Sequence, residues 1–219
     1  MNINNPSADP RMINLIMELR QQGITDLRVL SAIERVPRER FVPKNFSEQA
    51  YDNIALPIEQ GQTISQPYIV AFMCQALEIG PRMKVLEIGT GSGYNAAVLA
   101  QLCLRVYTIE RYRSLLKDAQ ARFADLGIGN ITTRFGDGAK GWPEQATFPR
   151  IIVTAAVKTP PPALIDQLAE EGIMLLPAQS SSGEQDIVRI RRGRTGVTEE
   201  CLLPVRFVPL VEGIPPKAV

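Results

Sequence analysis

Val85-Leu86-Glu87-Ile88-Gly89-Thr90-Gly91-Ser92-Gly93 combines a short apolar strand with three alternating glycines. A strand, a glycine turn and a helix open a nucleotide-binding βαβ unit, because glycines permit positive φ angles and close approach of a ligand to the backbone. The dinucleotide fingerprint would need its last glycine at position 94, which is Tyr94. Glu87 would repel a pyrophosphate but attract the sulfonium and ammonium of S-adenosylmethionine. The stretch therefore favours a methyl donor over a nicotinamide cofactor.

The composition is that of an ordinary globular domain. The 219 residues are 45% hydrophobic with a net charge of +1, which suffices for one sizeable core. This balance predicts no nucleic-acid partner, and we interpret the arginines at 189, 191, 192 and 194 as a solvated strand edge. The polar start lacks a basic segment followed by an apolar run, and no stretch of about eighteen apolar residues occurs. We expect a cytoplasmic monomer with no membrane partner.

The chain has no histidine, which excludes mechanisms that need an imidazole base, including Ser-His-Asp and Cys-His catalysis. Its three cysteines are far apart and form no CxxC pair, so the sequence predicts neither a disulfide framework nor a metal site. We expect small buried side chains at all three, Cys74, Cys103 and Cys201.

Short apolar runs rich in β-branched residues recur at the spacing of βα units. They predict five strands, followed by a C-terminal antiparallel hairpin, at 84–88, 105–109, 131–135, 151–154, 172–176, 185–192 and 200–208. Helical patterns lie between the first strands, at 94–102, 111–126 and 161–171. Continuous apolar strands are buried on both faces, so we predict an α/β fold with a doubly wound, mostly parallel, seven-stranded sheet.

The first part of the chain has a different pattern. We expect a helix over 11–22, a second from Thr25 as its N-cap to about Pro37, and a third over 67–77 after a polar loop. Residues 1–80 are therefore interpreted as an N-terminal helical cap and loop packed on an α/β domain at 81–219. The whole would form a single compact domain.

Two further acids follow neighbouring strands. Glu110 ends the second strand about twenty residues after the glycines, where a carboxylate can bind the ribose hydroxyls of an adenosine; alternatively, it is a first-turn acid that favours the next helix. Asp137, in Gly136-Asp137-Gly138, could accept a hydrogen bond from the amino group of an adenine. Alternatively, it is a simple turn aspartate. Parallel strands end at one edge, so we expect Glu87, Glu110 and Asp137 to project into one crevice that suits a cationic ligand.

Several motifs together resemble the protein-L-isoaspartate (D-aspartate) O-methyltransferase family, bacterial type. The stretch Gly61-Gln62-Thr63-Ile64-Ser65-Gln66-Pro67-Tyr68-Ile69-Val70 resembles that family's substrate-side signature. Four further segments resemble the family's cofactor-side motifs, at 85–97, 106–110, 136–138 and 152–156. Residues 206–210 resemble the family's usual C-terminal end. The resemblance implies a Rossmann-like class I methyltransferase fold. It also implies S-adenosylmethionine-dependent methylation of the free α-carboxylate of L-isoaspartyl residues in damaged peptides and proteins, which initiates their repair.

The same resemblance implies the roles of individual residues. Ser65 is then the active-site serine. The implied S-adenosylmethionine contacts are Ile64, Glu87, Gly89, Thr90, Gly91, Gly93, Glu110, Asp137 and Gly138. The implied substrate contacts are Thr63, Tyr68 and Gln185.

The absence of histidine is compatible with such a reaction. A carboxyl acceptor with a pKa near 4 is about 99.9% ionised at pH 7 and needs no base, whereas an amine or hydroxyl acceptor would have to lose a proton. We expect Ser65 to donate a hydrogen bond that positions the acceptor carboxylate. From spacing alone, Ser65 or Thr63 would instead cap the helix after Pro67.

Some segments depart from the family's pattern. The family usually has a histidine shortly before the glutamine of its substrate loop, where this chain has Glu59-Gln60-Gly61-Gln62, and residues 157–162 and 177–183 also differ. We expect these changes to affect which peptides the protein prefers and how well its loops are ordered, and not which methyl donor it uses. Two other functions stay open: a methyltransferase for another carboxyl-bearing small molecule or protein, which need not have the loop at 63–67, and a non-catalytic adenosine-ligand-binding module, in which Ser65 would be dispensable.

Overall fold

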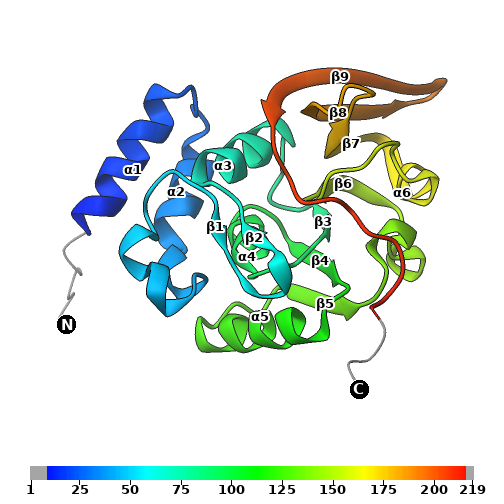
Figure 1. Cartoon of the computed structure of the whole chain (residues 1–219). Coiled ribbons are helices and arrows are strands. Elements are labelled where there is room, and N and C mark those ends of the chain that lie inside the picture. Colours follow the sequence, from blue (N-terminus) through cyan, green and yellow to red (C-terminus); the bar gives the residue numbers. More distant parts are fainter. Residues whose placement is uncertain (1–8, 216–219) are drawn as a thin grey trace.

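A computed structural model of the chain describes residues 9–215, and a seven-stranded sheet runs through its centre (Figure 1). The strand order is β5-β4-β3-β6-β7-β8-β9, parallel from β5 to β7 and antiparallel from β7 to β9. The strands are Lys84–Ile88 (β3), Arg105–Glu110 (β4), Ile131–Phe135 (β5), Phe148–Val153 (β6), Leu168–Gln179 (β7), Gln185–Gly193 (β8) and Gly196–Val205 (β9). The predicted α/β sheet and its C-terminal hairpin are confirmed.

Helices pack on both faces of the sheet. One face carries α1 to α5, and the other carries α6: Pro10–Gln21 (α1), Leu27–Arg35 (α2), Pro67–Ala76 (α3), Tyr94–Ala100 (α4), Arg113–Asp125 (α5) and Pro162–Gln167 (α6). Successive side chains of a strand point to opposite faces. Val85 therefore packs into the core that includes α1 to α5, while Leu86 joins Leu164 of α6 in a second core.

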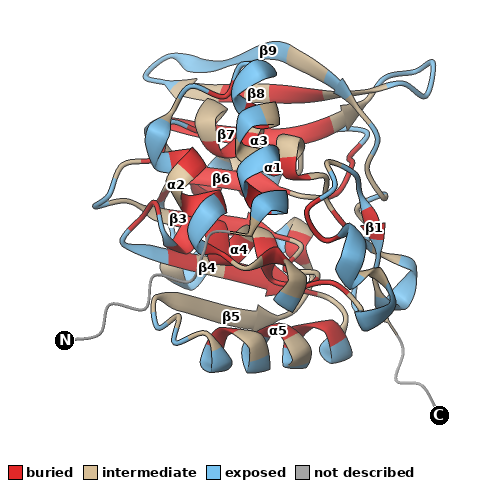
Figure 2. Cartoon of the chain, turned by 90° about the vertical axis from the view of Figure 1, so that its left-hand side faces the viewer, coloured by how far each residue is buried: buried red, intermediate tan, exposed pale blue. Residues whose placement is uncertain are grey.

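The N-terminal helices share their core with the sheet. In Figure 2, α1 and α3 lie in front of the strands, and their buried side chains belong to the cluster that contains Val85 and Val106. The guanidinium of the fully buried Arg38 lies over the ring of Tyr94, 4.8 Å from its centroid. This contact joins the N-terminal helices to the start of α4, directly after the glycine turn.

The helix predicted over 161–171 is wrong in its second half. α6 ends at Gln167, and residues 168–171 already belong to β7, where Leu168 is fully buried and pairs with Phe148. Gly172 permits this path, because a Cβ atom there would lie 2.6 Å from the carbonyl oxygen of Ala169. Tertiary packing of Leu168 therefore overrides the local helical pattern.

Other predicted ends shift by a few residues. Asp26, not Thr25, caps α2, since its carboxylate accepts from the backbone N–H of Arg28 at 2.9 Å. β9 is Gly196–Val205 rather than 200–208, because the hairpin closes tightly at Gly193 and Gly196 and the chain leaves the sheet after Val205. A two-stranded pairing of Leu56–Pro57 (β1) with Thr63–Ile64 (β2) was not predicted from the sequence.

The predicted arginine-rich strand edge needs correction, because Arg189, Arg191 and Arg192 lie on β8, which pairs with β7 and β9; the edge strand is β9. Arg189 forms ion pairs with Glu78 and Glu200, and Arg194 forms one with Glu170. Cys74 and Cys103 are buried, but Cys201 is exposed because it lies on the edge strand β9, so the expectation of burial was wrong there. Within residues 9–215, no helix combines the length and apolarity required for a membrane span.

Candidate active site

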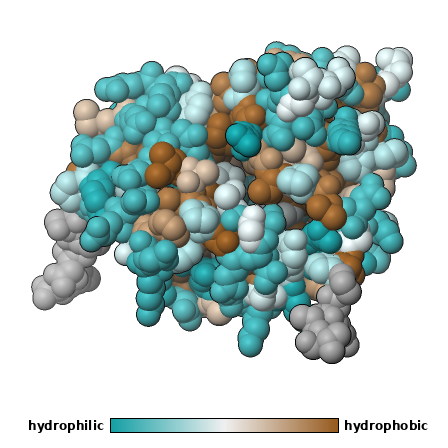
Figure 3. All heavy atoms as spheres, in the orientation of Figure 1, coloured by the Kyte–Doolittle hydropathy of each residue, from teal (hydrophilic) through white to brown (hydrophobic). Residues whose placement is uncertain are grey.

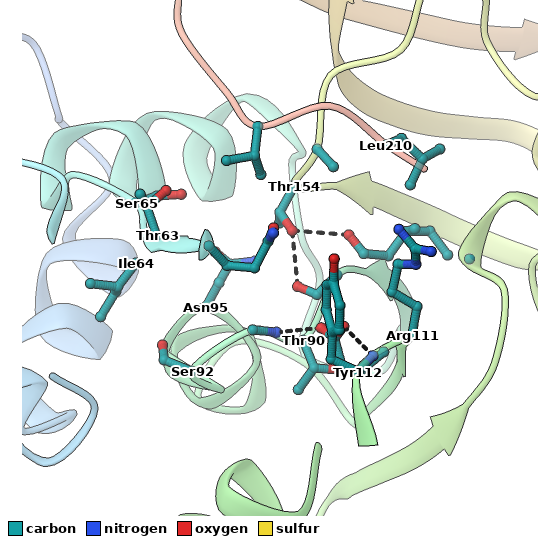
Figure 4. Close-up of a pocket in the computed structure, with 18 of the residues that line it drawn as sticks. Thr63, Ile64, Ser65, Thr90, Ser92, Asn95, Arg111, Tyr112, Thr154 and Leu210 are labelled. Atoms are coloured by element: carbon teal, nitrogen blue, oxygen red, sulfur yellow. Dashed lines mark hydrogen bonds between the residues drawn. The ribbon is translucent and has the colours of Figure 1, made fainter. Parts of the chain in front are cut away.

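One pocket lies at the carboxyl ends of β3, β4 and β6. Figure 3 shows apolar residues gathered around a hollow in the middle of this face. In Figure 4, Thr63, Ile64 and Ser65 lie on one side, Arg111 and Tyr112 on the other, and Asn95 and Thr154 between them. Ligands of open α/β sheets bind at this edge, where the strands end.

The glycine turn forms the floor of the pocket. Gly89 has φ +95°, and a Cβ atom there would lie 2.4 Å from Oγ1 of Thr154. Gly93, the N-cap of α4, has φ +91° and faces the ring of Phe123, which a Cβ atom would meet at 2.8 Å. Both positions thus require glycine for backbone conformation and for space. Gly89 lines the pocket, whereas Gly93 is not among the lining residues and packs against Phe123 and Ala119.

Glu110 is the acid that lines this pocket. Its Oε2 accepts from the backbone N–H of Gly91 at 2.8 Å, and its Oε1 accepts from that of Tyr112 at 2.9 Å. An ionised carboxylate offers about four acceptor positions. Two therefore stay available for a ligand, while the two backbone bonds fix the carboxylate and join the glycine turn to the end of β4.

Glu87 is fully buried beneath the pocket. Asn95 donates to its Oε1 at 2.7 Å, and Thr108 donates to its Oε2. The hydroxyls of Thr108 and Thr90 lie 2.7 Å apart, so Asn95 and Thr90 extend this chain of bonds to the pocket wall. Burial raises the pKa of Glu87 to about 7, because a low-dielectric environment disfavours the charged form.

Asp137 lies beside the pocket in a neighbouring cavity with Arg134 and Lys140. Its Oδ1 accepts from the backbone N–H of Ala139 at 3.0 Å, so it caps a 3₁₀ turn, as its simpler interpretation suggested. Gly138 does line the pocket and packs against Ile88. The expectation that three acids project into one crevice therefore needs correction: of Glu87, Glu110 and Asp137, Glu110 alone lines the pocket.

The predicted substrate segment forms the opposite wall. Thr63 and Ile64 pair with Pro57 and Leu56, which holds Ser65 at the pocket in a half-buried position. Helix α3 begins with Gln66 as its N-cap and has no side-chain capping bond. The capping alternative for Ser65 and Thr63 is therefore wrong, and both side chains are free to contact a ligand.

Two predicted substrate contacts lie outside the pocket lining. Tyr68 packs against Phe72, with ring centroids 6.0 Å apart, and belongs to the surroundings of the first core. Gln185 uses its side-chain amide to bind the backbone of Phe207. Neither residue is among those that line the pocket.

Sequence reasoning missed several lining residues. They come from strand ends, from the first turn of α4 and from the segment after β9: Ser92, Asn95, Arg111, Tyr112, Thr154, Val208, Pro209, Leu210 and Val211. The rule that ligands meet strand ends could have identified Arg111, and also Thr154, whose hydroxyl donates to the carbonyls of Ile88 and Gly89. The segment after β9 was indicated only by the family resemblance at residues 206–210, because its place at the pocket depends on long-range contacts.

Comparisons with known proteins agree on one family. The model of the family described as Protein-L-isoaspartate(D-aspartate) O-methyltransferase matches residues 11–214. The chain is 65% identical over 209 residues to the Protein-L-isoaspartate O-methyltransferase of Parvibaculum lavamentivorans, covering 94% of each chain. It is 60% identical to the protein of that name from Paramagnetospirillum magneticum, covering 95% of this chain and 98% of that one.

Solved structures show the same fold. A protein-L-isoaspartate O-methyltransferase is 29% identical with a TM-score of 0.83, over 90% of this chain and 65% of that chain. A putative protein-L-isoaspartate O-methyltransferase from Plasmodium falciparum, solved with S-adenosyl-L-homocysteine, is 23% identical with a TM-score of 0.79, over 90% and 97% of the two chains.

Because Glu87 is buried, we expect the stability of the protein to depend on pH. Unfolded glutamate titrates near pH 4.3, whereas the pKa of Glu87 in the folded protein is about 7. Between these values the folded state holds a proton that the unfolded chain has released, so the free energy of unfolding falls as the pH rises. Glu87→Gln, a neutral isostere, should remove this loss, which amounts to about 4 kcal/mol at most.

Urea unfolding at pH 5 and pH 8 measures this difference. The exposed Glu199 supplies a matched control, and Glu199→Gln should keep the wild-type dependence. An undiminished pH dependence in Glu87→Gln would show that Glu87 is not the responsible group.

Proposed function

This chain belongs to the protein-L-isoaspartate(D-aspartate) O-methyltransferase family, and we propose that it transfers a methyl group from S-adenosylmethionine to the free α-carboxylate of L-isoaspartyl residues. Methylation of these residues in damaged peptides and proteins initiates their repair. One observation carries the proposal: Ser65 and the nucleotide-binding elements, the glycine turn and Glu110, line the same pocket.

The residues of the donor side suit S-adenosylmethionine. Glu110 has two free acceptor positions for the ribose hydroxyls, and the glycine turn allows the methionine portion to approach the backbone. Gly138 leaves space for the adenine at the neighbouring strand end. The bound donor supplies an electrophilic methyl group on a sulfonium, whose positive charge is favoured beside the acidic Glu110.

The acceptor side suits a group that is already ionised. Among the lining residues that the structure describes there is no lysine, and the chain has no histidine. Each oxygen of Glu110 accepts from a backbone N–H, and its remaining positions are assigned to the ribose hydroxyls, so it is a poor base for deprotonating an amine or a hydroxyl. A carboxylate needs no such base at neutral pH, which favours carboxyl methylation over amine methylation.

Ser65 then acts by positioning. Its hydroxyl is half-buried at the pocket and makes no capping bond, so it can donate to one oxygen of the acceptor carboxylate. Most of the rate in an in-line transfer comes from alignment of the reacting groups, which can supply about 7 to 11 kcal/mol. A hydrogen bond that fixes the attacking oxygen contributes to this alignment.

Matched peptides test the proposed reaction. With labelled S-adenosylmethionine, a peptide containing one L-isoaspartyl residue should become labelled, whereas the same peptide with aspartyl or asparaginyl at that position should not. Equal labelling of the isoaspartyl and aspartyl peptides would favour a general carboxyl methyltransferase. Binding of the donor without labelling of any peptide would favour a non-catalytic binding module.

The role of Ser65 can be measured separately. Ser65→Ala should lower kcat/KM for the isoaspartyl peptide about ten- to a hundredfold, the effect of one hydrogen bond to a charged group. The dissociation constant for S-adenosylmethionine, measured by calorimetry, should stay within about twofold, because the donor is held mainly by the glycine turn and Glu110. The exposed Ser47, whose hydroxyl bonds the carbonyl of Lys44, provides the control Ser47→Ala. A folded Ser65→Ala protein that no longer binds the donor would contradict the positioning role.

The proposal includes the partners of the enzyme. Its near-neutral charge argues against nucleic acid, and its acceptors are peptides and proteins. We expect a cytoplasmic enzyme that acts as a monomer, because the donor and acceptor walls both come from one chain. Sedimentation equilibrium should give a single species near the chain mass of 24.2 kDa; a dimer mass would contradict this expectation.

A further inference from the structure

The chain leaves the sheet after Val205 and crosses the pocket as residues 206–211, a segment that we call the strap. In Figure 1 it is the red-orange coil that runs from β9 across the front of the sheet. Residues 208–211 of the strap line the same pocket as Ser65. The strap is therefore a wall of the site, although it belongs to no helix or strand.

The chain is hydrogen-bonded to β8 before the strap begins, and the strap itself is hydrogen-bonded to Ala156. Up to Val205 the chain pairs with β8, where Val205 lies opposite Gln185. Further on, the backbone of Ala156 donates to the carbonyl of Val208 at 2.8 Å and accepts from the N–H of Leu210 at 2.7 Å. Ala156 follows β6, so the second anchor lies on the parallel part of the sheet.

Gln185 anchors the strap between these two partners. Its Oε1 accepts from the backbone N–H of Phe207 at 2.7 Å, and its Nε2 donates to the carbonyl of Phe207 at 3.3 Å. A primary amide can bind a backbone unit in this way because it carries both a donor and an acceptor. The side chain thus extends the ladder of β8 beyond the last residue of β9.

From this geometry we propose that Gln185 is a positioning residue for the acceptor: it fixes the strap over the pocket and so sets how tightly a peptide is held. The inference rests on the proposed function. The donor side does not depend on this anchor, because the glycine turn and Glu110 are held by bonds between β3 and β4. Gln185 itself does not touch the ligand, since both polar atoms of its amide are engaged by Phe207.

Two substitutions test the anchor. Gln185→Met keeps the size of the side chain and removes both hydrogen bonds; Gln185→Glu keeps an acceptor for the Phe207 N–H and loses the donor. We expect KM for an isoaspartyl peptide to rise about tenfold in Gln185→Met, with kcat changed less than about threefold. The dissociation constant for S-adenosylmethionine should stay within about twofold. Trypsin should cleave faster after the exposed Arg206, because the strap is released.

The control is Gln179→Met. Gln179 lies opposite Gln185 in the same hairpin, but its amide bonds only Gly183 within the loop, so peptide KM and tryptic cleavage should match the wild type. If Gln185→Met does not fold by circular dichroism, Gln185→Glu serves as the test, with a smaller change of peptide KM and of tryptic cleavage in the same direction, because it loses one of the two hydrogen bonds.

Three outcomes would overturn the proposal: an unchanged peptide KM despite faster cleavage, an equal loss of donor and peptide affinity, or an effect matched by Gln179→Met. A wild-type protein that does not methylate the isoaspartyl peptide would refute the proposed function instead, and the tryptic comparison would still report whether Gln185 holds the strap.

Discussion

The site is organised around a carboxylate that has no cation beside it. Glu87 is fully buried, and no ion pair involves it within residues 9–215. A buried acid in this state must be stabilised by donors or take up a proton. Asn95 and Thr108 supply the donors, and through them Glu87 connects β3, β4 and α4. The glycine turn follows Glu87 directly, so its position depends on a fully buried group that does not line the pocket.

The pocket has two sides that are supported by different parts of the chain. The donor side consists of strand ends, which the parallel sheet brings together. The proposed acceptor side includes Thr63 and Ser65, held by a short pairing with residues 56 and 57, and the strap, held by Gln185 and Ala156. On the proposed function, changes in these segments would alter peptide preference without moving the donor. This separation agrees with the places where the sequence departs from the family's pattern, which lie outside the glycine turn.

The sequence predicted the elements whose signals are local. Apolar runs located the strands, and the glycine spacing located the turn, because φ angles and close contacts demand glycine at Gly89 and Gly93. It failed where tertiary contacts decide. Leu168 enters β7 because it packs against Phe148. Gln185 reaches a backbone unit 22 residues away. No pattern in a single sequence reports such pairings, because they depend on which segments the sheet has already brought together.

The strap also has a consequence for the order of folding. Its anchors are the side chain of Gln185 on β8 and the backbone of Ala156 after β6. The anchor on β8 is not in place until β7 and β8 have paired. The glycine turn depends on contacts with β4 and with Thr154 after β6, and both of these precede β8 in the chain. During synthesis the N-terminal parts of a chain emerge first. A nascent chain would therefore assemble the donor side earlier than the acceptor side, so the ability to hold a peptide is acquired last.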